Sequence, residues 1–152
     1  MQCVFKHNGV VDKFVGDCLM AIFGAIETDP KPELRAMEAA LDIQEAVDIG
    51  LNAHLKRKGL APITVGIGLH TGKVLAGFFG SPMRREYSVQ GDNVRIASKA
   101  CDEAKNNRVC ATGDTLLAAY PDLTFRTVGS KMMKGRKDPV YFYDAVRVTS
   151  GG

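Results

Sequence analysis

The sequence contains no tryptophan, no C-x-x-C pair among its four cysteines, and no apolar run that approaches the roughly 20 residues needed to span a bilayer. Its opening stretch, MQCVFKHNGVVDK, has no continuous apolar segment, which excludes a signal peptide of the usual kind. We therefore expect no membrane segment in this chain and a cytoplasmic setting, with any anchor lying outside these residues. The spacing of the cysteines predicts reduced, mostly buried thiols at Cys3, Cys18, Cys101 and Cys110.

The length and composition are those of one globular domain. The chain has 152 residues, of which 45% are hydrophobic and 24% are charged, so it can bury a substantial core and is not disordered overall. No low-complexity linker divides it, and we expect residues 1–150 to form a single domain. The net charge of +3, from 20 Lys and Arg against 17 Asp and Glu, is too small to indicate a nucleic-acid partner.

Turn and capping residues divide the chain into short strands and two long helices. Gly16-Asp17 between two β-prone runs predicts a hairpin with a type II′ turn, and the glycines of ITVGIGL indicate a close approach by another backbone. The expected elements are a hairpin over 10–15 and 18–23, a helix over 32–58 that Gly59 ends, a strand over 63–69, a hairpin arm over 73–79 entered from that strand, a strand over 86–89, a helix over 92–106, a strand over 109–111, a helix over 114–119, and strands over 123–128 and 139–146. This order predicts an α+β sandwich with helices on one face of a largely antiparallel sheet.

Four stretches carry groups suited to chemistry, and the first runs from Lys13 to Asp17. Asp17 lies at the expected hairpin tip, where a rigid turn can hold a carboxylate clear of the sheet. Mg²⁺ takes one or two carboxylates together with substrate phosphates, so Asp17 is a candidate metal ligand. An ordinary turn Asp beside its Gly is the alternative, and the local sequence leaves both open.

The second stretch, GLHTGKVLAGFFGSP, contains neither a G-x-x-x-x-G-K-[ST] phosphate loop nor a G-x-G-x-x-G fingerprint. Its lone His70 near a turn favours a structural histidine over a catalytic base. The third stretch places Arg95 and Lys99 one turn apart near a helix N-terminus, where free amides and the helix dipole favour a phosphate. The alternative there is a solvated face in which Lys99 pairs with Asp102 or Glu103.

The fourth stretch is a basic loop around Gly135. A solvated loop is the ordinary interpretation of such a charge run, and contact with a polyphosphate is the alternative. The cations of this loop are Lys131, Lys134, Arg136 and Lys137.

Three strings resemble signatures of the class III adenylate and guanylate cyclase catalytic domain and occur in the family's order. They are GVVDKFVGDCLMAIFG, VGIGLHTGKVLAGFFGSPMRREYSVQGDNVRIASK and KGRKDPVYFY, and the likeness runs over residues 8–143. The resemblance implies a ferredoxin-like sandwich that forms a head-to-tail homodimer with active sites at the interface. It implies conversion of a nucleoside triphosphate to a 3′,5′-cyclic nucleotide and pyrophosphate, with two Mg²⁺ or Mn²⁺ ions.

The resemblance assigns roles to individual residues. Asp17 matches the second of the family's two metal aspartates, and Lys13 matches a lysine that binds the purine for the site built on the partner chain's aspartates. Ser88 falls at the other purine-binding position, and Lys with Ser implies selection of adenine, hence ATP. Lys can donate to N1 of adenine, while a hydroxyl can accept from or donate to the ring edge. In the basic loop, we expect Lys134 and Arg136 to bind phosphate.

The chain departs from the family's pattern at three places. The family's opening strand, with the first metal aspartate, has no counterpart here, so we expect an N-terminally truncated fold. Arg95 stands where the family has an asparagine that orients the ribose. Lys99 stands where the family has a catalytic arginine, and it keeps the charge without the bidentate fork. We therefore expect Arg95 and Lys99 to serve as the catalytic cations, with weak or no activity in the isolated chain.

The sequence predicts an adenylate cyclase domain that acts in signal transduction under regulatory domains outside this chain. The alternative is a degenerate cyclase-homology module that acts by dimerisation or nucleotide binding, which the residues at positions 95 and 99 favour. An RNA-binding module of the same topology is disfavoured, because Phe78-Phe79 lacks the surrounding K/R-G-F/Y-G/A-F pattern.

Overall fold

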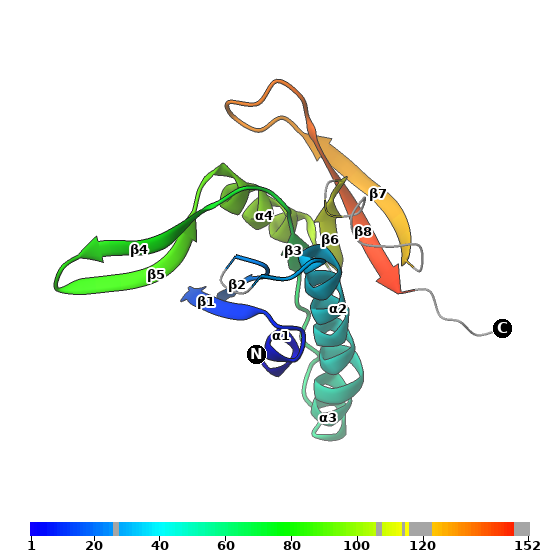
Figure 1. Cartoon of the computed structure of the whole chain (residues 1–152). Helices are drawn as coiled ribbons and strands as arrows, with labels where there is room; N and C mark the ends of the chain where they lie inside the picture. The colour runs from blue at the N-terminus through cyan, green and yellow to red at the C-terminus, as the bar shows by residue number, and fades with distance from the viewer. Residues whose placement is uncertain (26–27, 106–107, 114, 116–122, 148–152) are drawn as a thin grey trace.

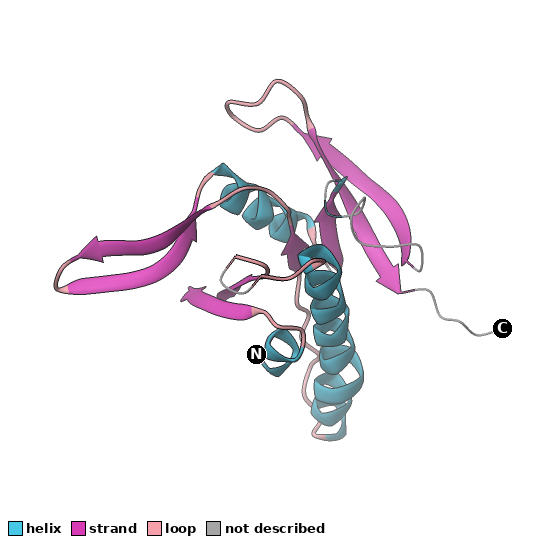
Figure 2. Cartoon of the chain, viewed as in Figure 1, coloured by secondary structure: helices cyan, strands magenta, loops and turns pink. Residues whose placement is uncertain are grey.

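The computed structural model describes the chain except for residues 26–27, 106–107, 114, 116–122 and 148–152 (Figure 1). The described residues form a four-stranded sheet, two separate hairpins, and helices packed against them (Figure 2). In chain order the elements are α1 (Gln2–Lys6), β1 (Val10–Val15), β2 (Cys18–Ile22), α2 (Pro32–Glu45), η1 (Ala46–Leu51), α3 (Asn52–Arg57), β3 (Ile67–Leu69), β4 (Leu75–Ser81), β5 (Arg84–Gln90), α4 (Asp92–Glu103), β6 (Val109–Thr112), β7 (Leu123–Lys131) and β8 (Val140–Arg147).

The central sheet has the strand order β3-β6-β8-β7. Strand β3 pairs with β6 in parallel, and the other two pairs are antiparallel. Strands β1 and β2 form one hairpin, and β4 and β5 form another that projects from the body as an arm (Figure 1). The α+β class and the largely antiparallel sheet are confirmed.

Helices α2 and α4 cover opposite faces of the central sheet. Successive residues of a strand point to opposite faces. On β6, Val109 and Ala111 share a buried cluster with Met37 of α2, while Cys110 between them shares another with Ile96 of α4. The expectation that the helices lie on one face is therefore wrong, because element order does not determine the face to which each connection leads.

The first hairpin has the strands and the turn that the sequence predicts. β1 ends and β2 begins on either side of Gly16-Asp17. Gly16 has a φ of +62°, and Asp17 does not have a positive φ. A positive φ at the first central residue alone is the pattern of a type II′ turn, which matches the twist of the flanking strands.

The helix predicted over 32–58 is one continuous helical path with a wider middle. Helix α2 leads into the π-helical segment η1 and then into α3. Gly59 ends it as predicted, because the amides of Gly59 and Leu60 bond the carbonyls of Lys56 and Leu55. The π-type winding of η1 rotates its residues relative to an ideal α-helix, and Leu51 is exposed.

Strand β3 is shorter than the predicted strand over 63–69. The close approach of another backbone, which the glycines of this segment predicted, is present at Gly68. A Cβ on Gly68 would lie 2.1 Å from the backbone nitrogen of Cys101, so α4 packs directly on the strand backbone. The chain does not fold back from β3 into a hairpin arm, because β3 pairs with β6 and β4 pairs with β5. That part of the prediction is wrong.

The later predicted elements correspond to β5, α4, β6, β7 and β8 with small differences at their ends. The helix predicted over 114–119 falls almost entirely outside the described residues. Helix α1 has no counterpart among the predicted elements. None of the helices in the described part of the chain is long and apolar enough to cross a membrane.

The four cysteines are free thiols in different surroundings. Cys110 is buried and Cys3 and Cys101 are partly buried, but Cys18 is exposed at the start of β2, so the expectation of mostly buried thiols holds only in part. Burial, and then the neighbouring carboxylate of Asp144, raise the pKa of the Cys110 thiol to about 12.

The substitution Gly68→Ala tests the contact between β3 and α4. The added methyl group would overlap the backbone of α4, so we expect the free energy of unfolding to fall by about 1–3 kcal/mol. Urea denaturation measures this change from the midpoint and slope of the transition. Gly77→Ala is the control, because a Cβ there meets no atom within 4 Å. An equal loss in both variants would contradict the packing account.

Iodoacetamide at about pH 8 should modify Cys18 in the folded protein and leave Cys110 unmodified. The thiolate is the reacting species, and the raised pKa of Cys110 keeps that buried thiol protonated. Peptide mass spectrometry after timed labelling measures both rates, and urea should make Cys110 reactive. Labelling of Cys110 as fast as Cys18 without urea would show that this part of the sheet opens readily.

Candidate functional site

Asp12 joins side chains from the two hairpins. It is the extra residue of a β-bulge, which the register between β1 and β2 skips. Its side chain is 4% exposed, and its Oδ2 accepts a hydrogen bond from Ser88 Oγ at 2.7 Å and lies 3.7 Å from Lys13 Nζ. The two predicted purine-binding residues, which we call the purine pair, therefore lie beside one carboxylate.

Asp17 lies exposed at the tip of the first hairpin, as predicted. The described residues contain no group of three or more His, Cys, Asp or Glu placed to hold a metal ion by themselves. One exposed carboxylate on a rigid turn nevertheless fits Mg²⁺, which binds one or two carboxylates and keeps its other positions for water and substrate phosphates. The geometry therefore suits a metal ion that arrives with a polyphosphate.

Arg95 is engaged within the chain. Its guanidinium bonds the carboxylate of Asp92 in the same turn of α4 and donates to the backbone carbonyl of Lys134 at 3.0 Å. These contacts tie the N-terminal end of α4 to the loop between β7 and β8. Arg95 therefore positions this loop, a role that its place in the sequence did not indicate.

Lys99 does not form the alternative pair with Asp102 or Glu103, since no ion pair among the described residues includes it. Glu103 instead pairs with Lys131, whose hydrogen bond holds the pKa of Glu103 below its usual range. Lys99 adds only a weaker, longer-range attraction. Lys99 is partly buried and lies one turn from Arg95 on α4.

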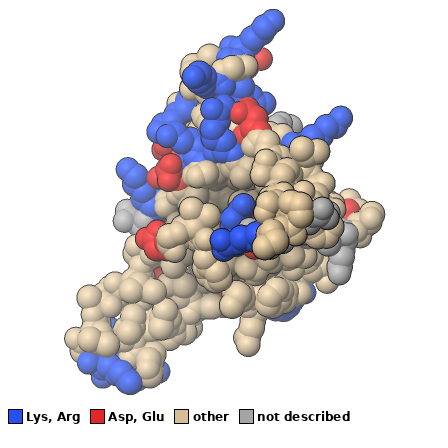
Figure 3. Space-filling view, turned by 90° about the vertical axis from the view of Figure 1, so that its left-hand side faces the viewer, with Lys and Arg blue, Asp and Glu red and all other residues tan. Residues whose placement is uncertain are grey.

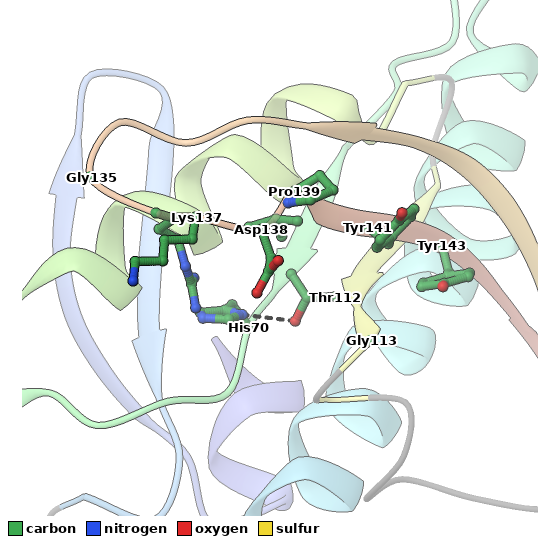
Figure 4. Close-up of a pocket in the computed structure, with 11 residues that line it drawn as sticks. His70, Thr112, Gly113, Gly135, Lys137, Asp138, Pro139, Tyr141 and Tyr143 are labelled. Atoms are coloured by element: carbon green, nitrogen blue, oxygen red, sulfur yellow. Dashed lines mark hydrogen bonds between the residues drawn. The ribbon is translucent and has the colours of Figure 1, made fainter.

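The basic loop between β7 and β8 forms one wall of a pocket of about 440 Å³ (Figure 4). Lys and Arg side chains gather where this loop projects at the top of the molecule (Figure 3). Arg136 lines the pocket from the loop, Thr112 lines it from β6, and His70 lines it from the position just after β3. Of the two predicted phosphate-binding residues, Arg136 lines the pocket, whereas Lys134 does not line it and is held through its backbone carbonyl by Arg95.

His70 is held at both ring nitrogens. Nδ1 lies 2.7 Å from Thr112 Oγ1, and Nε2 lies 2.7 Å from Asn93 Oδ1. The amide nitrogen of Asn93 donates to the carbonyl of Lys73, so its oxygen faces the ring and His70 Nε2 is the donor. His70 therefore links β3, α4 and β6 as a structural histidine, as expected.

Asp12 and Asn93 organise the site and were not singled out from the sequence. A signal for Asp12 exists in VVDKFV, where two adjacent charged residues follow two valines and break the alternation of a strand. A bulge is the usual way to accommodate such a break. Asn93 has no comparable signal, since an Asn in the first turn of a helix is ordinary.

The family of this chain follows from comparison with known proteins. Residues 4–144 match the model of the adenylate and guanylate cyclase catalytic domain. The chain therefore belongs to the family of adenylate and guanylate cyclase catalytic domains.

Two relatives illustrate the range of similarity. Adenylate cyclase 1 of Rhizobium meliloti is 28% identical over 149 residues, which are 97% of this chain and 22% of that protein. An uncharacterized protein of Mycobacterium tuberculosis is 36% identical over 118 residues, which are 76% of this chain and 20% of that protein. The chain thus spans about a fifth of the length of the curated relatives it matches.

Solved structures confirm the class III cyclase fold. The guanylyl cyclase Cya2 superposes with a TM-score of 0.84 at 30% identity, over 99% of this chain and 76% of that chain. The adenylyl cyclase CyaB from P. aeruginosa superposes with a TM-score of 0.88 at 24% identity, over 98% of this chain and 77% of that chain.

Removing the Arg95 side chain should loosen the β7–β8 loop. Arg95→Ala deletes the contacts to Asp92 and Lys134, so we expect amide exchange over residues 132–139 to become about threefold to tenfold faster. Hydrogen–deuterium exchange with mass spectrometry measures this rate. Lys99→Ala removes a cation one turn away and should leave it unchanged. Equal exchange in Arg95→Ala and the unaltered protein would exclude the positioning role.

Proposed function

We propose that this domain is an adenylate cyclase, which converts ATP to 3′,5′-cyclic AMP and pyrophosphate. The proposal is carried by the meeting of Lys13 and Ser88 at Asp12, because it gathers the residues that match the family's purine-binding positions. Lys13 donates to N1 of adenine, and Ser88 meets the amino group at position 6. Similar solved structures include both an adenylyl and a guanylyl cyclase, so the choice of base rests on these side chains.

The remaining predicted residues surround the reacting phosphates. In the reaction the ribose 3′-oxygen attacks the α-phosphorus and pyrophosphate leaves. We assign the partly exposed cation of Lys99 to the negative charge that develops on the α-phosphate, with Arg95 beside it as a second cation. Lys134 and Arg136 contact the polyphosphate from the basic loop, and Arg95 holds that loop in place through the Lys134 carbonyl.

Asp17 would hold a divalent cation through its exposed carboxylate. Two Mg²⁺ or Mn²⁺ ions bound with the triphosphate supply charge neutralisation and a more acidic 3′-hydroxyl. The family's other metal aspartate has no match within residues 1–152. The contribution of this chain is therefore to place one carboxylate against the phosphates of a bound nucleotide.

A second copy of the chain completes the site in this proposal. The arm formed by β4 and β5 and the first hairpin expose large apolar side chains, namely Leu75, Phe78 and Met83 of the arm and Phe14 of the hairpin. Apolar groups gathered on projecting elements are typical of protein contact surfaces. A head-to-tail homodimer covers them and sets the purine pair of one chain opposite Asp17 of its partner. We propose that this one-domain unit works in the cytoplasm under regulatory domains outside the chain.

A degenerate cyclase-homology module is the second candidate, and one observation favours it. Arg95 is already bonded to Asp92 and Lys134, so its guanidinium is less available to a substrate than a free side chain would be. Such a module would bind a nucleotide or a second copy without turnover. Nucleotide binding with no product formation would therefore distinguish it from the enzyme.

The activity test compares Asp17→Asn with the unaltered protein. Chromatographic detection of cyclic AMP from ATP, with Mg²⁺ or Mn²⁺, should show product from the unaltered protein and at least about 100-fold less from the variant, because the variant loses a metal-binding carboxylate. Where residues precede Met1 in the natural protein, the assay uses the protein with those residues included.

Asp48→Asn is the matched control, since it makes the same change on the exposed surface of η1. It should retain full activity. Failure of the unaltered protein to form any cyclic nucleotide, with ATP binding intact, would reject the enzyme in favour of the degenerate module. Equal activity of Asp17→Asn and the control would remove Asp17 from the site.

A further inference from the structure

The hydroxyl hydrogen of Ser88 already forms a hydrogen bond within the chain. Ser88 is 4% exposed, and its Oγ lies 2.7 Å from Asp12 Oδ2. A hydroxyl has one hydrogen and two acceptor positions, whereas a carboxylate oxygen only accepts. The hydrogen of Ser88 therefore points to Asp12, and a group that approaches Oγ from any other side meets a lone pair.

The surroundings of Asp12 keep the hydrogen there. The carboxylate is almost wholly enclosed, at 4% exposure, and Ser88 and Lys13 both approach its Oδ2. A hydrogen bond to an enclosed carboxylate is stronger than one between neutral groups, and a buried acceptor that loses its partner is penalised. A ligand carbonyl would thus compete poorly for the hydrogen of Ser88.

We propose that Asp12 determines the choice of base, because it makes Ser88 an acceptor only. This inference rests on the proposed adenylate cyclase site. Adenine presents an amino donor at position 6 and an acceptor at N1, whereas guanine presents a carbonyl acceptor at position 6 and a donor at N1. With Ser88 at position 6 and Lys13 at N1, adenine is complementary at both positions and guanine is opposed at both.

A serine without such a partner would discriminate less strongly between adenine and guanine. Its hydroxyl hydrogen would rotate to accept from the adenine amino group or to donate to the guanine carbonyl. The family resemblance allowed Ser88 either to donate a hydrogen bond to the purine or to accept one from it. The contact with Asp12 leaves only the acceptor role. The bulge in β1 serves this purpose, since it turns Asp12 inward toward β5 and leaves Lys13 partly exposed beside it.

The test measures binding, so that it stands apart from turnover. The probes are 3′-deoxy-ATP and 3′-deoxy-GTP, which lack the attacking hydroxyl, and calorimetry with Mg²⁺ gives their dissociation constants. In Asp12→Asn, the new amide can donate to Ser88 and release the serine hydrogen toward the ligand. We expect the preference for the ATP analogue to fall at least about tenfold, mainly through tighter binding of the GTP analogue.

Two further variants separate base selection from a general loss of structure. Asp48→Asn carries the same change on η1 and should keep the preference of the unaltered protein. Adding Ser88→Asp to Asp12→Asn should restore the preference, because a carboxylate at position 88 accepts from the adenine amino group with no hydrogen of its own. A merely structural role of Asp12 would weaken both nucleotides equally and would not be rescued.

The outcomes distinguish this inference from the proposed function. An unchanged preference in Asp12→Asn, with the unaltered protein favouring the ATP analogue, overturns the inference and leaves the adenylate cyclase proposal standing. Absent or equal binding of both analogues by the unaltered protein overturns the proposed purine site itself. If Asp12→Asn does not fold, Ser88→Ala carries the test, since it should weaken the ATP analogue alone, and an equal loss of both analogues refutes the inference.

Discussion

The direct contact between strand β3 and helix α4 positions much of the site. This close contact is possible because two residues of the segment are glycines, which have no side chain to keep the helix away. A Cβ on Gly66 would lie 2.0 Å from the carbonyl oxygen of Ala104, and one on Gly68 would overlap the backbone near Cys101. Helix α4 therefore lies on the strand itself, and its buried Ile96 joins the core under β6 and β8. The first part of α4, which carries Arg95, is held to the β7–β8 loop by the hydrogen bond from Arg95 to the Lys134 carbonyl.

Polar side chains then set the orientation of parts that backbone pairing does not join. The first hairpin and the arm belong to different sheets, and the Asp12–Ser88 hydrogen bond connects them. The Arg95 guanidinium connects α4 to the basic loop in the same way. Each bond uses a charged group, which makes it stronger than a neutral hydrogen bond and sensitive to a single substitution.

The parts of the fold that follow from local rules could be predicted from the sequence. The II′ turn needs only a glycine with positive φ, and the stop at Gly59 needs only a residue suited to a helix end. The parallel partner of β3 and the two faces taken by the helices depend on contacts between distant residues, which no local pattern records. In the proposed site, the family resemblance singled out Lys13, Ser88 and Asp17, while the hydrogen bond between Asp12 and Ser88 could be found only in the folded structure.

Strand β5 carries the buried Ser88 near its junction with α4 and extends from there to the exposed Met83 at the turn of the arm. At about 3.3 Å per residue, the two residues are about 17 Å apart along the strand. When the paired strands of the arm rotate as one unit about the end near α4, Met83 at the turn moves much farther than Ser88. A contact made at the outer end of the arm therefore disturbs the Asp12–Ser88 hydrogen bond less than a contact near its base would.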